Sequence, residues 1–397
     1  MGWIEEKGQL FEMIENGTNL KVANIILDGR FGGPQNRILQ VAERLKKYGI
    51  ETVVIIPKKD SETFYAKLIE KNIQVKRLNL HRLTKHKPHL IGWFIFFIPE
   101  LISLFKYLKK ENIRLVHCNT SWQIKGVLAG KMARAKIILH LNDTWTPLGI
   151  RIVFRLLSPL CDGFIVTGKR VKECYFKGKE INVKNVKEIQ APVDIKYFDP
   201  KYAEKDRVIG NNQGIKIITT ANINPTKGLE YFIEMASFLN KKYGDGNVDF
   251  YIVGACFDSQ KKYLAKLKQL IHKFNIRNLH FYGKSDNIPS VLKAADIFVC
   301  TSLDESGPMS VWEAMAMEKA IVSADVGDVS RYIRNGENGF VVPVGDVDAL
   351  AEKVGILIED KNLRHKFGKL ARAVAVRELD IEICAQKHKQ FYLEVLG

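Results

Sequence analysis

Short apolar runs alternate with amphipathic stretches along most of the chain. In the first half, short, largely apolar runs such as 22–28, 51–57 and 113–119 are separated by stretches such as 35–49, in which apolar residues recur at helical spacing. Strands that are apolar throughout belong to sheets covered on both faces, and their alternation with helices makes them parallel. The pattern therefore predicts an α/β protein with a doubly wound sheet.

The alternation lapses once, at 201–214, which is rich in charged residues, Gly and Asn and is typical of a linker. A second series of the same kind follows. We therefore expect two doubly wound, Rossmann-like domains facing a central cleft, one formed by residues 1–195 and one by residues 196–380. The final helix, within 381–397, is expected to pack back on the first domain. Such sheets bind ligands at the carboxyl ends of their strands.

Composition narrows the class of protein without choosing a function. The 397 residues are 46% hydrophobic and 26% charged, which is typical of a globular protein with large cores. The formal net charge of +17 attracts anionic partners, which include nucleic acid, a membrane surface and phosphorylated substrates. Charge alone leaves these three open.

Cysteine usage and the amino-terminal residues indicate the compartment. The six cysteines form no C-x-x-C pair, as expected for free thiols in a reducing cytosol. The first residues are acidic where a signal peptide is basic, so a cytoplasmic location is expected. The apolar segment 90–105 is interrupted by Pro99 and Glu100 and is shorter than the ~20 residues of a spanning helix. Core packing and contact with a membrane surface both remain open for it.

Two glutamates mark the strongest candidate site. Glu305 lies in the loop that follows the predicted strand 297–302, and Glu313 lies in the next predicted helix. A carboxylate near a helix N-terminus interacts favourably with the helix dipole. Taken alone, Glu313 could therefore be no more than a stabilising cap.

The residues around this pair carry a specific resemblance. From 295 to 351 the chain closely resembles the donor site of glycosyltransferase family 4, whose members are retaining sugar-nucleotide enzymes of the GT-B fold. The order of elements agrees over roughly residues 20–397. The resemblance implies that Glu305 meets the donor sugar and that Glu313 holds the ribose hydroxyls. An ionised carboxylate is a strong hydrogen-bond acceptor for a vicinal diol.

The loop at 220–230 resembles the family's phosphate-binding segment. The resemblance implies that Lys227 neutralises the leaving diphosphate, although a solvated loop lysine is the alternative. The family usually has Gly-Arg where this chain has Ala221 and Asn222. Asn222 can donate hydrogen bonds but carries no charge, so another cation such as Arg30 would have to substitute, or the phosphate site is weaker.

Main-chain groups complete the expected donor site. Pro308 supplies no N–H, so the amides that follow it are the expected contacts at that helix start. A glycine loop before the first helix resembles the family's amino-terminal loop and allows close approach of a ligand. A turn that resembles the base-binding turn places backbone groups near the base. The residues concerned are Met309, Ser310, Val311, Gly32, Gly33 and Ile288.

A catalytic histidine and a metal site are less clear from the sequence. His140 lies near the place where many family members carry a functional His, but the alignment also fits Asn142, and a buried structural histidine is an equal alternative. Asp346 and Asp348 have the D-x-D spacing of metal-dependent transferases of another fold. Here they resemble the start of a helix with Asp346 as its cap, and we expect no metal.

The combined prediction is a retaining, metal-independent hexosyltransferase. It uses a UDP- or GDP-linked sugar as cosubstrate, needs no other cofactor, and acts on a glycan or lipid-linked acceptor in the synthesis of cell-surface polysaccharide or glycoconjugate. Peripheral contact with anionic lipid at the inner membrane face is left open. The alternatives are an epimerase or hydrolase on the same fold, and a basic nucleic-acid-binding protein. The sequence leaves the sugar, base, acceptor, linkage and oligomeric state undetermined.

Overall fold

The computed structural model describes residues 20–83, 87–177, 185–211 and 213–397. The chain divides into two compact units, which are described separately. Unit 1 comprises Met1–Ala191 together with Ile381–Gly397, and unit 2 comprises Pro192–Asp380.

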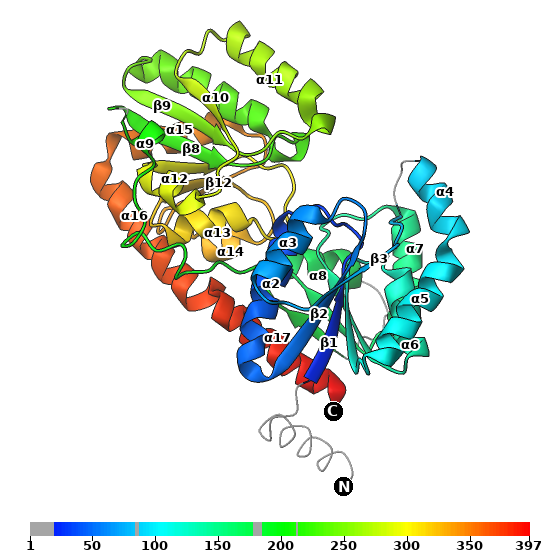
Figure 1. The fold of residues 1–397 in the computed structure, drawn as a ribbon. Coiled ribbons are helices and arrows are strands. Elements are labelled where there is room, and N and C mark those ends of the chain that lie inside the picture. The colour runs from blue at the N-terminus through cyan, green and yellow to red at the C-terminus, as the bar shows by residue number, and fades with distance from the viewer. Residues whose placement is uncertain (1–19, 84–86, 178–184, 212) are drawn as a thin grey trace. The chain divides into compact units, whose positions relative to one another are not determined.

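Unit 1 contains a seven-stranded parallel sheet in the order β3-β2-β1-β4-β5-β6-β7 (Figure 1). Its register aligns Val22 of β1 with Thr52 of β2 and with Leu115 of β4. The central strands are buried over nearly their whole length because helices cover both faces, as their apolar sequences predict. The strands are β1 (Leu20–Ile25), β2 (Ile50–Pro57), β3 (Val75–Leu78), β4 (Leu115–Asn119), β5 (Lys136–Leu141), β6 (Gly163–Val166) and β7 (Val186–Glu188).

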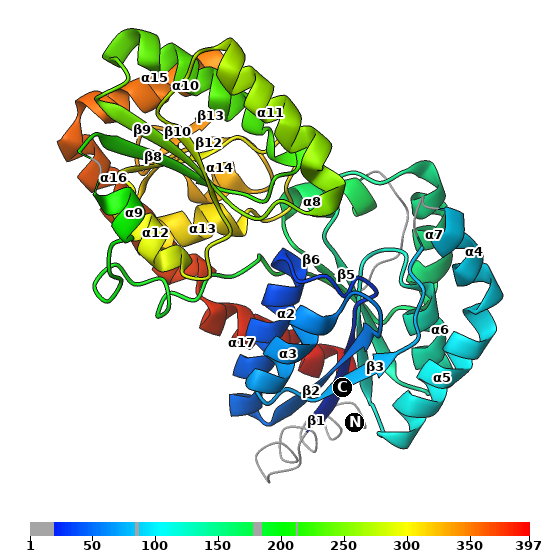
Figure 2. The same cartoon turned by 45° about the horizontal axis from the view of Figure 1, so that its top comes forward.

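Two helical layers cover the unit 1 sheet, as Figures 1 and 2 show. One layer contains α2, α3 and α17, which pack on one face of the sheet. The other contains α5, α6, α7 and α8, which share a core with the opposite face, and α4 contacts α5. The helices are α2 (Gly33–Leu45), α3 (Glu62–Glu70), α4 (Lys87–Ile95), α5 (Phe97–Lys110), α6 (Ile124–Met132), α7 (Leu148–Leu157), α8 (Lys169–Phe176) and α17 (Ile381–Leu396), with single turns η1 (Lys46–Tyr48) and η2 (Ser158–Leu160).

Local sequence explains the first of these helices. Pro34 occupies the first turn of α2, where its missing N–H costs no hydrogen bond. Ile38, Val41 and Leu45 recur at helical spacing and are all buried. They face the sheet and α17, so the last helix of the chain belongs to the core of unit 1.

Unit 2 contains a six-stranded parallel sheet in the order β10-β9-β8-β11-β12-β13. Ile217 of β8 pairs with Phe250 of β9 and with Ile297 of β11, so β8 and β11 are central. The strands are β8 (Ile215–Thr220), β9 (Val248–Val253), β10 (Leu279–Gly283), β11 (Ile297–Cys300), β12 (Ala320–Ala324) and β13 (Phe340–Val342). The predicted α/β class with two doubly wound parallel sheets is thus confirmed.

Two layers of helices also cover the unit 2 sheet (Figure 2). Helices α10, α11 and α15 pack on one face, and α9, α12, α13 and α14 pack on the other, while α16 contributes to both cores. The helices are α9 (Arg207–Gly210), α10 (Leu229–Tyr243), α11 (Lys261–Lys273), α12 (Ile288–Ala294), α13 (Met309–Ala316), α14 (Val329–Tyr332), α15 (Val347–Glu359) and α16 (Lys361–Val374), with single turns η3 (Pro225–Lys227), η4 (Asp258–Gln260) and η5 (Ala375–Leu379).

The apolar segment near residue 95 forms parts of two helices, α4 and α5. Within the part of the chain that the structure describes, no helix is both long enough and apolar enough to span a membrane. Leu101, Leu104 and Leu108 are buried in the unit 1 core, whereas Phe94 and Ile98 are exposed. Core packing therefore holds for the buried face of this segment, and contact with a membrane surface stays a prediction for the exposed face.

Candidate functional site

The unit 2 sheet reverses its order between β8 and β11. The chain runs from β8 outward to β9 and β10, and then returns to place β11 on the other side of β8. Loops that leave two such strands diverge, and open α/β sheets bind ligands at this switch point. Lys227 follows β8 and Glu305 follows β11, so these two predicted residues lie in the two diverging loops.

Lys227 and Glu305 form an ion pair between these loops. Lys227 Nζ donates to Glu305 Oε1, and the Ser302 hydroxyl donates to the same oxygen at 3.1 Å. The two charged side chains are 28% and 17% exposed. Burial acts to lower the pKa of Lys227, but the Glu305 carboxylate outweighs burial and the pKa is raised. Lys227 is therefore charged at neutral pH, and its charge lies at the switch point.

Gly228 explains why the lysine is followed by glycine. Its φ of 57° lies in the left-handed region, and a Cβ at this position would lie 2.3 Å from the Thr301 carbonyl oxygen. The Thr301 hydroxyl donates to the Lys227 carbonyl at 3.0 Å, and the Leu303 amide donates to the Thr226 carbonyl at 2.8 Å. These contacts hold the loop that carries Lys227 against the end of β11.

A second glycine supports Glu305 from the next loop. Gly327 follows β12 and has a φ of 53°. A Cβ at Gly327 would lie 3.0 Å from the Glu305 carbonyl oxygen and 2.9 Å from that of Ser306. Backbone packing therefore positions Glu305 in addition to its side-chain contacts.

Helix α13 carries the other predicted donor contacts. Met309 begins the helix directly after Pro308, and Ser310 is half-buried. The Val311 amide donates to the Pro308 carbonyl at 2.9 Å and its side chain is buried in the core, so this predicted backbone contact is already engaged within the turn. Burial raises the pKa of Glu313 to about 8. Its carboxyl group is therefore largely protonated at neutral pH, whereas the sequence argument assumed an ionised carboxylate.

Two further predicted positions lie elsewhere in unit 2, one in a loop and one in a helix. Asn222 is exposed after β8, and its Oδ1 accepts a hydrogen bond from the Ala255 amide at 3.1 Å. Ile288 is half-buried at the first turn of α12. In unit 1, Arg30 pairs with both carboxylate oxygens of Asp28, at 3.0 and 2.6 Å. Arg30 is thus already paired with an acid within its own unit.

The glycine loop of unit 1 leads directly into α2. Gly32 caps the helix with an extended backbone, and Gly33 is its exposed first residue. Any residue can adopt the φ of −161° found at Gly32, so backbone conformation does not require glycine here. What glycine provides is the absence of a side chain near the helix N-terminus.

A buried guanidinium, which was not predicted from the sequence, lies one turn into α2. Arg37 is 5% exposed, and it donates to Asn142 at 2.8 Å and to Asn119 at 3.4 Å. Burial lowers its pKa to about 10. Asn142 also accepts from the Thr167 hydroxyl at 2.7 Å. The place where the family's His more naturally falls is therefore part of a buried polar network.

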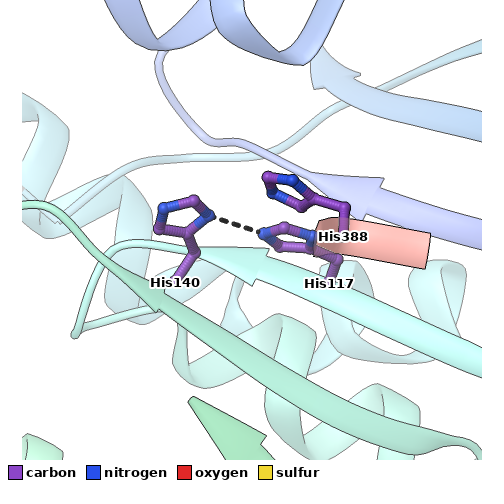
Figure 3. A group of neighbouring side chains, drawn as sticks. All are labelled: His117, His140 and His388. Carbon is purple, nitrogen blue, oxygen red and sulfur yellow. Dashed lines mark hydrogen bonds between the residues drawn. The ribbon is translucent and has the colours of Figure 1, made fainter. Parts of the chain in front are cut away.

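His140 lies inside unit 1, in a cluster that Figure 3 shows. It is fully buried, and its Nδ1 is 3.0 Å from Nε2 of His117 on β4. His117 Nδ1 lies 2.6 Å from the Tyr392 hydroxyl, and His388 stacks near both rings. Tyr392 and His388 belong to α17, which covers this face of the sheet. The structure therefore favours the buried structural histidine that the sequence left as the alternative, and we remove His140 from the catalytic set.

The same three histidines could be considered as metal ligands. Across the described ranges, only His117, His140 and His388 form a group of three His, Cys, Asp or Glu residues whose donor atoms all lie within 4.8 Å of one another. Burial, with Arg37 as an additional cause, lowers the pKa of each imidazole. The Arg37 charge, which contributes to the lowered pKa of each imidazole, opposes a divalent cation at this group.

The D-x-D segment is confirmed as the start of a helix. Asp346 is the cap of α15, and its Oδ1 accepts from the Ala349 amide at 2.9 Å. Ser302 and Gly327, which hold Glu305, were not predicted from the sequence. Ser302 had a usable signal, because a hydroxyl residue directly follows the apolar strand that leads into the Glu305 loop. The role of Gly327 is visible only in the structure, from its close approach to the carbonyl oxygens of Glu305 and Ser306.

Known protein families match both units of the chain. A model described as "Glycosyltransferase Family 4" matches residues 31–197, and one described as "Glycosyl transferases group 1" matches residues 202–374. An Escherichia coli UDP-Gal:alpha-D-GlcNAc-diphosphoundecaprenol alpha-1,3-galactosyltransferase is 24% identical over 75% of this chain and 80% of its own length.

Two further matches are informative. A Campylobacter jejuni N,N'-diacetylbacillosaminyl-diphospho-undecaprenol alpha-1,3-N-acetylgalactosaminyltransferase is 30% identical over 51% of this chain and 53% of its own length. The solved structure of Anabaena HepE in complex with UDP has a TM-score of 0.78 at 19% identity, and the match covers 94% of this chain and 99% of HepE. This last likeness shows the shared fold. The alternative of a nucleic-acid-binding protein is not favoured, since both units match transferase models. The chain belongs to glycosyltransferase family 4 and has the two-domain GT-B fold.

Proposed function

We propose that this chain transfers a hexose from a UDP- or GDP-linked sugar to a lipid-linked glycan, with retention of anomeric configuration and without a metal ion. The observation that carries the proposal is the Lys227–Glu305 pair at the switch point of the unit 2 sheet. The names of the two relatives support the acceptor class, because both describe transfer to a glycan on diphosphoundecaprenol.

The chemistry proposed for the pair follows from the charges that develop in the reaction. Transfer breaks the bond between the anomeric carbon and the diphosphate, so negative charge grows on the leaving nucleoside diphosphate. A preorganised cation stabilises that charge more than it stabilises the substrate. Lys227 takes this role, and in doing so it shifts from Glu305 to a phosphate oxygen. Glu305 then accepts hydrogen bonds from hydroxyls of the donor sugar.

Retention fits this arrangement without a covalent intermediate. The acceptor hydroxyl attacks the anomeric carbon on the face that the diphosphate leaves, and its proton passes to the departing phosphate oxygen. The glycosidic bond forms as the sugar–phosphate bond breaks, so atoms and charge balance within the two substrates. Glu305 orients the sugar and carries no covalent bond in this scheme.

The remaining donor contacts are assigned by chemical type. The amides of Met309 and Ser310, at the start of α13, are the proposed phosphate donors beside Lys227. Glu313 binds the ribose diol, and Ile288 supplies close main-chain surface within unit 2. Asn222 contributes a neutral amide. Because Lys227 supplies positive charge at the diphosphate, the reaction is proposed to need no metal.

A cytoplasmic location with peripheral attachment to anionic membrane is part of the same proposal. A formal charge of +17 favours approach to an anionic surface. A lipid-linked acceptor stays in the bilayer, so an enzyme that acts on its glycan is proposed to work at the membrane surface.

The proposal is tested first by binding and then by transfer. A thermal-shift panel of UDP- and GDP-sugars identifies the donor, because a ligand that binds only the folded protein raises its unfolding temperature. Transfer to a synthetic lipid-linked glycan is then measured with and without a chelator, and NMR of the product reports the anomeric configuration. Lys227→Ala and Glu305→Gln should abolish most turnover. Wild-type turnover in both variants, or inversion of configuration, would contradict the mechanism.

A further inference from the structure

Unit 1 contains a cavity that none of the predicted donor residues line. Its volume is about 590 Å³, within the range of about 300–1,000 Å³ that is usual for small-molecule sites. It lies where β1, β2 and β3 end, since Leu27, Pro57 and Leu78 are among its lining residues. Carboxyl ends of parallel strands are where open α/β sheets bind ligands.

The cavity has a basic mouth. Five lysines and arginines and three acids line it, which leaves a net charge of plus two. Two of the acids are already neutralised: Asp28 pairs with Arg82 at 2.7 Å and with Arg30, and Glu100 pairs with Lys125. Within the described ranges, Lys58 and Lys59 have no acidic partner, and both are exposed. Their ammonium groups are available to an anion.

The wall of the cavity is apolar and firmly built. Phe96 and Pro99 of the α4–α5 region line it. The His81 ring stacks on Phe96 at 5.1 Å, and its backbone amide donates to Glu100 at 3.0 Å. Lys125 of α6 is 1% exposed and donates to Glu100. This buried network fixes the first turn of α5 beside the cavity.

The same two helices carry an exposed apolar surface, which we call the apolar ridge. It consists of Ile91, Phe94, Ile95, Phe96, Ile98 and Ile102, which are 59%, 65%, 65%, 46%, 58% and 40% exposed. Phe96 belongs both to the ridge and to the cavity wall, so the two surfaces are continuous. Monomeric proteins rarely expose such a patch unless it binds something.

A neighbouring helix extends this apolar character. Leu148, Ile152 and Leu156 of α7 follow one another at four-residue intervals and are 74%, 50% and 71% exposed. Helix α7 packs in the same layer as α5, because Phe154 and Leu104 share one core. Figures 1 and 2 both show α4, α5 and α7 on one side of the unit 1 sheet.

We propose that the cavity binds the phosphate end of a phosphorylated lipid and that the apolar ridge carries its chain into the bilayer. Lys58 and Lys59 bind the phosphate, the carbons next to it contact Phe96 and Pro99, and the chain continues over the ridge. The occupant is a long isoprenoid diphosphate. A free phosphate would use the lysines but leave the ridge without a partner. This inference rests on the proposed function, of which it names the acceptor's lipid end.

The test uses the full chain and a short soluble probe, farnesyl diphosphate, with inorganic pyrophosphate and farnesol as its separate halves. Calorimetry should give tighter binding of farnesyl diphosphate than of either half. Lys58→Ala/Lys59→Ala should weaken it roughly 25-fold, about fivefold for each cation removed. The control Lys366→Ala/Lys369→Ala removes two exposed lysines of α16 and should change nothing. Equal affinity for pyrophosphate and farnesyl diphosphate, or unchanged binding in the Lys58/Lys59 variant, overturns the inference.

The ridge is tested with phosphatidylcholine vesicles that contain polyprenyl diphosphate. Phe94→Ser/Ile95→Ser should reduce co-sedimentation about tenfold or more, since both exposed side chains lose their apolar contact with lipid. Leu370→Ser/Val376→Ser changes two exposed apolar residues of unit 2 and should co-sediment like the wild type. Equal losses in both variants would overturn the role of the ridge.

Nucleotide-sugar binding is measured in parallel on the same samples. The Lys58/Lys59 variant should keep its full thermal shift with the donor. If lipid diphosphate binds as described and no nucleotide sugar binds, the proposed transferase mechanism fails while the lipid site stands. If the donor binds and the lipid diphosphate does not, the reverse holds.

Discussion

Acidification should destabilise unit 1 through His388. The imidazole is 2% exposed, and its Nδ1 lies 2.8 Å from the Cys384 carbonyl oxygen. Burial lowers its pKa from 6.5 to about 4, the Cys384 carbonyl opposes that fall, and the Arg37 charge adds to it. On acidification, His388 is therefore protonated near pH 6.5 in the unfolded chain but only near pH 4 in the folded chain. Stability falls as the pH drops through this window.

The size of the effect follows from the two pKa values. A fall from 6.5 to about 4, at about 1.36 kcal/mol for each pKa unit, gives roughly 3 kcal/mol as the full acid-induced loss of stability through His388. Most of this loss should be complete by about pH 4.5. The lowered pKa values of His117 and His140, for which burial is the first cause, act in the same direction.

The assay is urea unfolding near pH 7.5 and near pH 4.5, followed by tryptophan fluorescence. Trp312 is the one tryptophan between residues 192 and 380, so a Trp312→Phe background makes the signal report on unit 1. In this background His388→Phe should lose about 2–3 kcal/mol less than its parent over that interval. His365→Phe, at an exposed position of α16, should follow the parent. Identical acid losses in His388→Phe and its parent would refute a buried neutral imidazole.

Three further predictions concern the unit 2 site. Lys227→Ala should lower turnover about 10²–10³-fold, or about 2.7–4 kcal/mol, because the cation acts on charge formed in the transition state. The control Lys262→Ala, at an exposed position of α11, should keep wild-type turnover. Similar losses of turnover in both variants would argue against the role assigned to Lys227. Gly228→Ala should destabilise unit 2 by about 1–3 kcal/mol in thermal unfolding, since its Cβ would clash with the Thr301 carbonyl. Gly246→Ala is the control, because a Cβ there meets nothing within 4 Å. Equal melting temperatures for both variants would show that the Gly228 loop can move to accommodate the Cβ. Nucleoside diphosphate should bind more tightly as the pH rises toward 8, by up to about tenfold per pH unit, because ribose binding requires Glu313 to lose its proton. Calorimetry on Glu313→Gln should show no such dependence of affinity on pH. A pH dependence that persists in this variant would assign the proton to another group.

Local pattern was sufficient for the fold class and for the loops that carry the site. Apolar runs separated by amphipathic stretches predict parallel strands with helices on both faces. A strand that is buried on both sides has apolar residues on both faces, so its sequence does not alternate between apolar and polar residues. The same argument located Lys227 and Glu305 in loops that leave carboxyl ends of strands. The D-x-D segment was correctly identified as a helix start, since capping depends on residues only a few positions apart.

Tertiary structure alone decided which of these residues meet. Lys227 and Glu305 lie 78 positions apart, and they pair because the strand order places β8 beside β11. His140 is buried because α17, from the far end of the chain, packs on its face of the sheet. Burial of Glu313 raises its pKa, and the apolar segment of α4 and α5 divides into a buried and an exposed face. Local sequence sets periodicity and capping, whereas burial, charge environment and pairing depend on contacts between segments that are remote along the chain.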